Sequence, residues 1–261
     1  MTPAIADDVA ARLHGTPLLL MLDVDGTLCD IVQRADDARV PEETRELLRR
    51  LARRPDVCMA IVTGRAAADA HRMDGINGIR ISGNHGIERW DANGAERIAP
   101  GWERVARSMR AAVAELARVP LDFPGTSVED KQFTITVHFR QADPATVPAL
   151  RDEVGEIAER HALRRAEGKA VINLFPPLDI DKGDAVRALV RECGADAPGA
   201  AVLFAGDDVT DEDAFTALAT HVPGAVTIRV GDDATRTAAT FRVATPRDLA
   251  TILERLERER P

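Results

Sequence analysis

Two aspartates, one residue apart, are the first candidates for chemistry in this chain. Asp23 and Asp25 directly follow the apolar run 18–22, and Gly26 comes next. Burying one carboxylate costs free energy, and two like charges close together cost more. A bound cation would offset that cost, so the pair predicts a metal site; the alternative is that both are capping or turn aspartates.

Three more segments place polar residues after an apolar run or at the start of a helix. They are 63–65 (Thr-Gly-Arg), 182–183 (Lys-Gly) and 206–213, which contains Asp207 and Asp208. In an open α/β sheet, ligands bind beyond the carboxyl ends of the strands. Mg²⁺ is held there through one or two carboxylates together with substrate phosphate. The four segments therefore predict a site for Mg²⁺ and a phosphate group on one edge of a sheet.

Each of these residues also has an ordinary structural reading. Thr63 is a suitable helix cap, and the two functions are compatible because helix N-termini bind anions. Lys182 alone would be a surface lysine, and Asp207 and Asp208 alone could be turn residues. The prediction depends on their occurring together.

The elements that must position these residues alternate between strand and helix. Strands with continuous apolar runs are expected at 18–22, 57–62, 201–205 and 225–229. Helices are expected at 42–54, 183–193, 211–219 and 248–257. This alternation predicts a doubly wound α/β core with a parallel sheet.

The middle of the chain has a different pattern. The segment 102–116 has a helical apolar stripe, and residues 133–140 alternate between apolar and polar with period two. A second helix is expected at 144–161, and two short strands at 163–167 and 170–174. The pattern predicts a core from residues 1–100 and 179–261, with an α+β insert at 101–178.

Composition excludes several classes of function. The formal net charge of −9 argues against a broad nucleic-acid surface, which would have to be basic. The apolar runs fall well short of the roughly 20 residues that span a bilayer, and the N-terminus does not resemble a signal peptide. Three scattered cysteines indicate neither a zinc site nor a disulfide framework, so a reducing cytoplasm is expected. The sequence does not show an oligomeric state, and a monomer is taken as the expectation.

The four segments, in order, resemble the motifs of the haloacid dehalogenase (HAD) phosphatase superfamily. They read DVDGT, VTGR, DKG and GDDVTDED. The middle resembles the trehalose-6-phosphate phosphatase family through GNHGIE (83–88), VEDKQFTITVHFR (128–140) and EGKAVINLFPP (167–177). The resemblance implies a Rossmann-like HAD core with an inserted cap that reads the sugar, and Mg²⁺-dependent hydrolysis of trehalose 6-phosphate to trehalose and phosphate.

The resemblance also implies catalytic roles. Asp23 would attack phosphorus and form an aspartyl-phosphate, and Asp25 would protonate the leaving sugar oxygen and then activate water. Thr63 would hydrogen-bond a phosphoryl oxygen. Lys182 would balance the charge on the phosphate and on Asp23. Catalysis would then consist mainly of positioning and charge stabilisation.

The metal ligands follow in the same way. Asp23, the backbone carbonyl of Asp25 and Asp207 would hold Mg²⁺, while Asp208 and Asp211 would support it directly or through water. The expected substrate-binding residues are Gly64, Arg65, His85, Glu129, Lys131, Arg140, Lys169 and Asn173. For His85 a structural histidine is the competing interpretation, and for the charged residues of 128–140 it is the solvated face of a sheet.

One departure from the family pattern leaves the substrate open. Where the family usually has Glu-x-Arg-Pro, this chain has Asn173 and Phe175 before Pro176. Asn173 can still bind a hydroxyl, because an amide both donates and accepts hydrogen bonds. The alternatives are a phosphatase for another disaccharide or sugar phosphate, a phosphomutase-like transferase, a phosphorylatable receiver or a non-catalytic sugar-phosphate sensor. The presence of Asp25 and of the insert speaks against a receiver, which needs neither.

Overall fold

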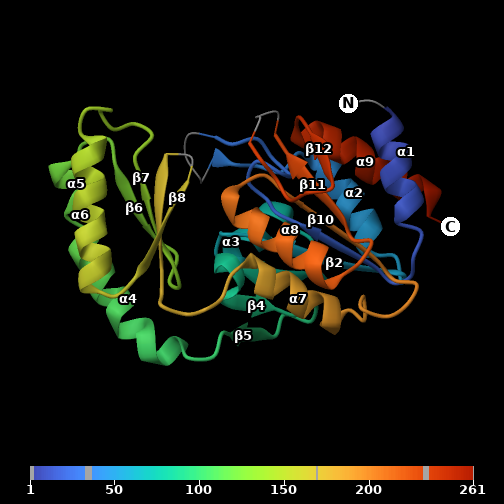
Figure 1. Ribbon diagram of the computed structural model, residues 1–261, viewed down its shortest axis with the longest axis horizontal. Helices are drawn as coiled ribbons and strands as arrows, with labels where there is room; N and C mark the ends of the chain where they lie inside the picture. The colour runs from blue at the N-terminus through green and yellow to red at the C-terminus, as the bar shows by residue number, and fades with distance from the viewer. Residues whose placement is uncertain (1–2, 33–36, 169, 232–234, 261) are drawn as a thin grey trace. The chain divides into compact units, whose positions relative to one another are not determined.

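The computed structural model describes residues 3–32, 37–168, 170–231 and 235–260 (Figure 1). The chain forms two compact units. The core unit comprises Met1–Arg97 and Ile180–Pro261, and the inserted unit is Ile98–Asp179. The sequence pattern had placed the limits of the insert at 101 and 178.

The core unit is built on a mixed sheet with the strand order β12-β11-β10-β1-β2-β3-β4-β5. The strands are β1 (Leu18–Leu22), β2 (Val57–Val62), β3 (Arg80–Gly83), β4 (Glu88–Trp90), β5 (Glu96–Ile98), β10 (Ala201–Gly206), β11 (Val226–Val230) and β12 (Phe241–Val243). The strands from β12 to β3 are parallel, and β4 is antiparallel to β3. The prediction of a parallel α/β core is therefore confirmed.

Helices cover both faces of this sheet (Figure 1). They are α1 (Pro3–Arg12), α2 (Glu42–Ala52), α3 (Ala67–Asp74), α7 (Lys182–Glu192), α8 (Val209–His221) and α9 (Pro246–Glu259). In β1, Leu18, Leu20 and Leu22 pack on the face covered by α1, α2 and α9. Leu19 and Met21 pack on the face covered by α7 and α8. Because both faces are buried, the strand needs apolar residues at every position.

The inserted unit is an antiparallel sheet with helices on one face. Its strands are β6 (Ser127–Asp130), β7 (Ile135–His138), β8 (Arg164–Gly168) and β9 (Val171–Phe175), in the order β6-β7-β9-β8. Its helices are α4 (Trp102–Leu116), α5 (Val119–Asp122) and α6 (Val147–Arg160). Ile135 and Val137 of β7 pack with α4 and α6, as the period-two pattern predicts. Thr134 and Thr136, on the alternate face, are also buried.

The sequence-based prediction that no disulfide is present is wrong. Cys58 in β2 and Cys193, the C-cap of α7, form a disulfide with their Cα atoms 6.2 Å apart. The two cysteines are 135 residues apart in sequence. They meet only because α7 packs beside β2, which spacing along the chain does not reveal.

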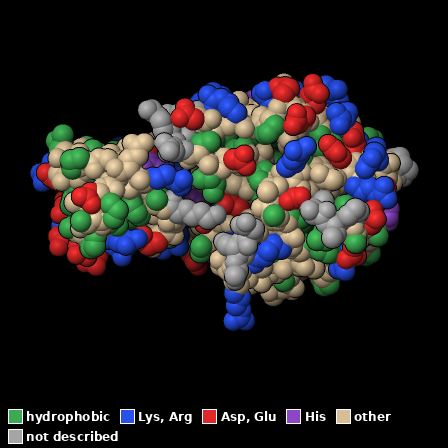
Figure 2. All heavy atoms as spheres, turned by 90° about the horizontal axis from the view of Figure 1, so that it is seen from above, with side chains coloured by type: hydrophobic (Ala, Val, Ile, Leu, Met, Phe, Trp, Pro, Cys, Tyr) green, Lys and Arg blue, Asp and Glu red, His purple; other side chains and the backbone are tan. Residues whose placement is uncertain are grey.

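Surface and helix properties agree with the composition. Acidic and basic side chains intermingle over the face seen in Figure 2, and on that face the described residues form no continuous basic patch. Of the helices within the described ranges, none combines the length and the apolar character required to traverse a bilayer.

Candidate active site

The turn after β1 brings two sequence-distant aspartates together. Asp23 is buried, and its N–H donates to the carbonyl oxygen of Ala205 in β10, 2.9 Å away. Gly26 has a φ of 75°, and a Cβ atom there would lie 2.2 Å from Oδ2 of Asp207. Only glycine satisfies both conditions, so Gly26 lets the carboxylate of Asp207 lie against the turn that carries Asp23.

Lys182, the first residue of α7, links two of the buried carboxylates. Its Nζ donates to Oδ1 of Asp23 at 3.0 Å and to Oδ1 of Asp211 at 2.7 Å. The N-terminus of α7 is fixed by a capping box in which the side chain of Asp181 accepts from the N–H of Asp184. This local cap places the lysine where the sequence predicts it, beside Asp23.

Asp211 organises the rim, by which we mean the edge of the sheet where β1, β2 and β10 end. Both of its carboxylate oxygens accept hydrogen bonds. While Oδ1 binds Lys182, Oδ2 accepts from the backbone N–H groups of Asp207 and Asp208, both at 2.9 Å. Asp208 caps α8, and its Oδ1 accepts from the N–H of Val209. Asp211 therefore holds the loop that presents Asp207.

The electrostatics of the rim favour an additional cation. Burial raises the pKa of Asp23 well above its ordinary value; Lys182 opposes this shift, and Asp211, Asp207 and Asp25 reinforce it. Burial lowers the pKa of Lys182, but the charges of Asp211 and Asp23 outweigh burial and raise it overall. Among the described residues, the three buried carboxylates of this group thus lie around the ammonium group of Lys182, an arrangement that favours an additional cation.

The donor set fits a divalent metal ion. One carboxylate oxygen from each of Asp23, Asp207 and Asp211 lies within 4.8 Å of the others, and all three residues are buried. Oxygen donors of this kind suit hard cations. Since the Asp211 oxygens already hold Lys182 and the loop, Asp23 and Asp207 are the carboxylates best placed to bind it.

The loop after β2 contributes the predicted hydroxyl group. Thr63 is buried, and its Oγ1 accepts from the N–H of Arg65 at 3.2 Å. His85 donates its backbone N–H to the carbonyl of Thr63 at 3.0 Å. A Cβ atom on Gly64 would lie 2.5 Å from Nε2 of His85, so glycine is needed for the imidazole to lie there. The structure thus brings the predicted residues Thr63, Gly64, Arg65 and His85 together.

The ion pair between Arg65 and Asp25 was not predicted. Nε and Nη2 of Arg65 donate to the two carboxylate oxygens of Asp25 at 2.6 and 2.7 Å. It could have been found from the pairing of β1 with β2. Because these strands are parallel neighbours, charged residues that follow them meet at one edge of the sheet.

Sequence reasoning also missed the part played by Glu88. Its Oε1 accepts from the N–H of Ala67 at 2.8 Å and from Nδ2 of Asn84 at 2.6 Å. Burial raises the pKa of Glu88. This carboxyl group joins the start of α3 to the turn that carries His85, whose φ is 57°. The motif GNHGIE was recognised, but nothing in it reveals which residue anchors the turn.

Cys29 lies close to the turn after β1 but has the properties of a packing residue. Its Sγ donates to the carbonyl of Val24 at 3.5 Å, and burial raises the pKa of its thiol to about 12. The thiolate is the nucleophilic form, so burial of this thiol disfavours a nucleophilic role for Cys29.

In the inserted unit, polar residues line up across three strands. Glu129 of β6 lies opposite Thr136 of β7, which lies opposite Asn173 of β9. Thr136 Oγ1 donates to Oδ1 of Asn173 at 2.9 Å, and Oε2 of Glu129 is 2.8 Å from Nε2 of His138. Lys131 Nζ is 3.8 Å from the same oxygen.

The remaining predicted positions of the inserted unit differ in their surroundings. Arg140 is exposed, and Lys169 lies outside the described residues. Phe175, at the second departure from the family pattern, has the guanidinium carbon of Arg164 5.7 Å from its ring centroid.

Solved structures show the fold of the chain. A haloacid dehalogenase-like hydrolase from Bacteroides thetaiotaomicron matches with a TM-score of 0.64 over 91% of this chain and 98% of its own, at 15% identity, which shows the fold alone. A crystal structure described as a trehalose-6-phosphate phosphatase related protein matches with a TM-score of 0.80 and 29% identity, over 92% of this chain and 97% of that chain. The fold is that of the HAD-like hydrolases.

Sequence comparison identifies the particular family. The model of the trehalose-phosphatase family matches residues 21–247, and the chain belongs to this family. Trehalose-phosphate phosphatases of Mycobacterium tuberculosis and Mycobacterium bovis are 35% identical over 98% of the chain. The chain spans 64% of the length of these relatives. A Mycobacterium tuberculosis protein named an uncharacterized glycosyl hydrolase is 32% identical over 94% of the chain, which covers 18% of that protein.

Replacing the buried lysine tests the electrostatic account. Lys182→Met leaves Asp23 and Asp211 without their common partner, so we expect the free energy of unfolding at pH 8 to fall by about 3–5 kcal/mol in metal-free buffer. Urea unfolding measures it. The matched control in the same helix is Arg187→Met, which removes a half-exposed pair with Asp184 and should cost no more than about 1 kcal/mol. Equal losses in the two variants would contradict the account.

Proposed function

We propose that the chain is a Mg²⁺-dependent phosphatase that hydrolyses trehalose 6-phosphate to trehalose and phosphate, the last step of trehalose biosynthesis. The observation that carries the proposal is the buried group Asp23, Asp207, Asp211 and Lys182, which combines a nucleophile, metal ligands and a counter-charge. Membership of the trehalose-phosphatase family supports the choice of substrate.

Asp23 is the proposed nucleophile. Lys182, 3.0 Å from Oδ1 of Asp23, orients this carboxylate and offsets the charge of an incoming phosphate. Attack on phosphorus forms an aspartyl-phosphate on Asp23 and releases the sugar oxygen, and water then hydrolyses this acyl phosphate. Asp23, Asp207 and the carbonyl of Asp25 are the proposed Mg²⁺ ligands, with Asp208 the further candidate, and the ion supplies charge stabilisation for the phosphoryl group.

Asp25 is the proposed acid and base, and Arg65 controls its availability. Both oxygens of Asp25 accept hydrogen bonds from Arg65, so the carboxyl group must leave this pair before it protonates a leaving oxygen. A phosphate group, like a carboxylate, can accept two parallel hydrogen bonds from a guanidinium group. We propose that the substrate phosphate takes over Arg65 and thereby releases Asp25, while Thr63, Gly64 and His85 line the same loop.

Sugar recognition is assigned to the inserted unit. The proposed residues are Glu129, Lys131, Arg140, Lys169 and Asn173. Hydrogen bonds to hydroxyl groups make such a site selective, because a wrong sugar leaves a buried polar group unpaired. We propose a cytoplasmic location for the enzyme.

Phosphate release measures the function directly. We expect turnover of trehalose 6-phosphate with Mg²⁺, and a loss of about a thousandfold or more in Asp23→Asn, because the amide cannot form the acyl phosphate. Circular dichroism establishes that this variant is folded. Undiminished turnover in folded Asp23→Asn would refute the mechanism, and binding of the sugar phosphate without phosphate release by the wild type would indicate a sensor.

The family pattern has glutamate where this chain has Asn173. This difference makes another disaccharide or sugar phosphate the second candidate substrate. We expect the wild type to prefer trehalose 6-phosphate in a panel with sucrose 6-phosphate, glucose 6-phosphate and glucosylglycerol phosphate, and Asn173→Glu to change that preference by less than about tenfold. A sharp gain in Asn173→Glu on trehalose 6-phosphate alone would identify another disaccharide phosphate as the native substrate. Conversion of glucose phosphate isomers without phosphate release would identify a mutase.

Metal binding should stabilise the fold more at high pH. The pKa of Asp23 is raised above its ordinary value of 3.8, so its contribution to stability is present below that pH and is lost as the pH rises through the raised folded value. Mg²⁺ binds the ionised carboxylates and restores this loss. We expect about 10 mM Mg²⁺ to raise the Tm by several degrees at pH 8 and by much less at pH 5.

Two variants at adjacent positions test this prediction, one at a proposed metal ligand and one as its matched control. Asp207→Asn should lose most of the Mg²⁺-induced Tm shift at pH 8. Asp208→Asn should keep more of the Mg²⁺-induced shift. Asparagine also caps a helix, so the start of α8 and the loop that presents Asp207 should stay in place. A shift that is the same at both pH values, or unchanged in Asp207→Asn, would exclude the proposed metal site.

A further inference from the structure

The disulfide of the core unit has no place in the proposed phosphatase mechanism. It joins Cys58, near the start of β2, to Cys193, which follows the last turn of α7. Both cysteines are half-buried, and both line a pocket. Partly exposed disulfides are the ones open to exchange with thiols in solution.

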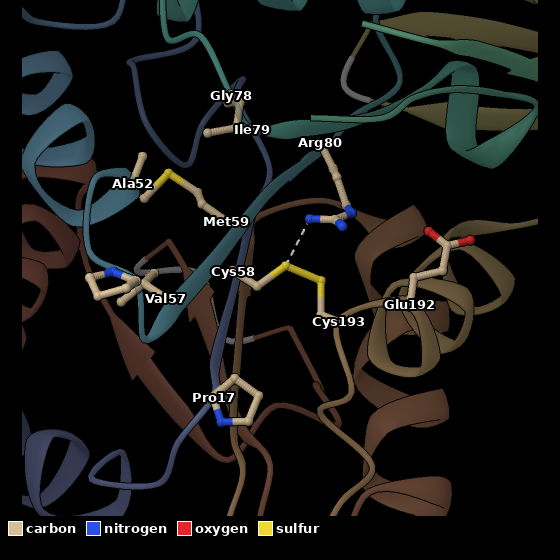
Figure 3. Close-up of a pocket in the computed structure, with 11 residues that line it drawn as sticks. Pro17, Ala52, Val57, Cys58, Met59, Gly78, Ile79, Arg80, Glu192 and Cys193 are labelled. Atoms are coloured by element: carbon tan, nitrogen blue, oxygen red, sulfur yellow. Dashed lines mark hydrogen bonds between the residues drawn. A yellow bond between two sulfur atoms is a disulfide. The ribbon is translucent and has the colours of Figure 1, made fainter. Parts of the chain in front are cut away.

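A pocket of about 310 Å³ lies beside the two sulfur atoms (Figure 3). Both cysteines, Arg80 and Glu192 line it, together with apolar side chains such as Met59 and Ile79. Its volume is at the lower end of the range for small-molecule sites, roughly 300–1,000 Å³. A small thiol that carries charged groups therefore fits both its size and its lining.

Arg80 makes the bond chemically asymmetric. Its Nη1 donates to Sγ of Cys58 at 3.1 Å, a contact drawn in Figure 3. A guanidinium group beside sulfur stabilises the thiolate, and a stabilised thiolate is the better leaving group in thiol–disulfide exchange. Cys58 is accordingly the sulfur that leaves, and Cys193 the one that is attacked.

We propose that Cys58 and Cys193 form a reversible dithiol–disulfide site that exchanges with low-molecular-weight thiols through this pocket. The thiolate of a first small thiol attacks Sγ of Cys193; the S–S bond breaks and its electron pair leaves with Cys58. A second small thiolate attacks the resulting mixed disulfide and releases Cys193. The protein gains two electrons and two protons, and the two small thiols are oxidised to their disulfide.

The redox state of this site changes the stability of the protein. The bond fastens the C-terminal end of α7 to β2 and closes a long loop, with a sequence separation of 135 residues. Opening it restores conformational freedom to the unfolded chain, so the dithiol form of the protein is the less stable one. The third cysteine, Cys29, is buried elsewhere in the core unit and is free.

Thiol counting across a redox series tests the proposal. The full chain is equilibrated in buffers of increasing reduced-to-oxidised glutathione ratio, quenched, alkylated after denaturation and weighed by mass spectrometry. We expect one label (Cys29) in the oxidised buffer and three in the reduced buffer, with a fall in Tm of at least about 5 °C. The Cys58→Ser/Cys193→Ser variant should carry one label and keep the lower Tm at every ratio.

A pair of variants at position 80 tests the chemistry. In excess reduced glutathione, Arg80→Gln should open the disulfide several-fold more slowly than the wild type, and Arg80→Lys should retain most of the rate because it keeps the positive charge. Circular dichroism verifies the fold of each variant. Three labels in oxidised glutathione, one label in a large excess of reduced glutathione, or equal rates for Arg80→Gln and the wild type would overturn the proposal.

Discussion

The arrangement of the rim depends on one buried ammonium group. Lys182 contacts Asp23, which follows β1, and Asp211, which lies in the first turn of α8. Asp211 in turn fixes the backbone of Asp207 and Asp208. Three segments distant in sequence are thus held by one network of charge-assisted hydrogen bonds, which are the strong ones in a protein interior. Because the carboxylates outnumber the ammonium group, the same network that builds the site also leaves it ready to bind a cation.

The sequence was sufficient for the parts of this site that backbone topology determines. Strands β1, β2 and β10 are continuous apolar runs, so their ends could be found, and parallel pairing places those ends at one edge. The roles of Asp211 and Glu88 were not accessible in this way. Whether a carboxylate binds a metal, a lysine or backbone N–H groups depends on side-chain rotamers and on loop geometry. The disulfide was missed for a related reason, since it requires the packing of α7 against β2.

In the inserted unit, too, the sequence pattern predicted the face that packs on the helices but not the individual side-chain contacts. Period-two alternation predicted which face of β7 packs on the helices, and the packing of Ile135 and Val137 with α4 and α6 confirms it. Strand register could not be predicted, and it decides which side chains meet. It places Asn173 opposite Thr136 and Phe175 opposite Arg164. The position where the family pattern has arginine thus has an arginine on the neighbouring strand, and its guanidinium lies over the Phe175 ring.

The pair formed by Arg65 and Asp25 shows why exposure matters as much as distance. The side chain of Arg65 is 12% exposed, whereas that of Asp25 is 41% exposed. An ion pair with one solvated partner contributes little net stability, on the order of 1 kcal/mol, because water competes for the carboxylate. A dianionic phosphate can displace such a partner from the guanidinium at small cost. Lys182 and Asp23, at 3% and 6% exposed, cannot be separated so easily. Burial therefore divides the two aspartates of one motif into a fixed carboxylate, the proposed nucleophile, and a movable one, the proposed acid.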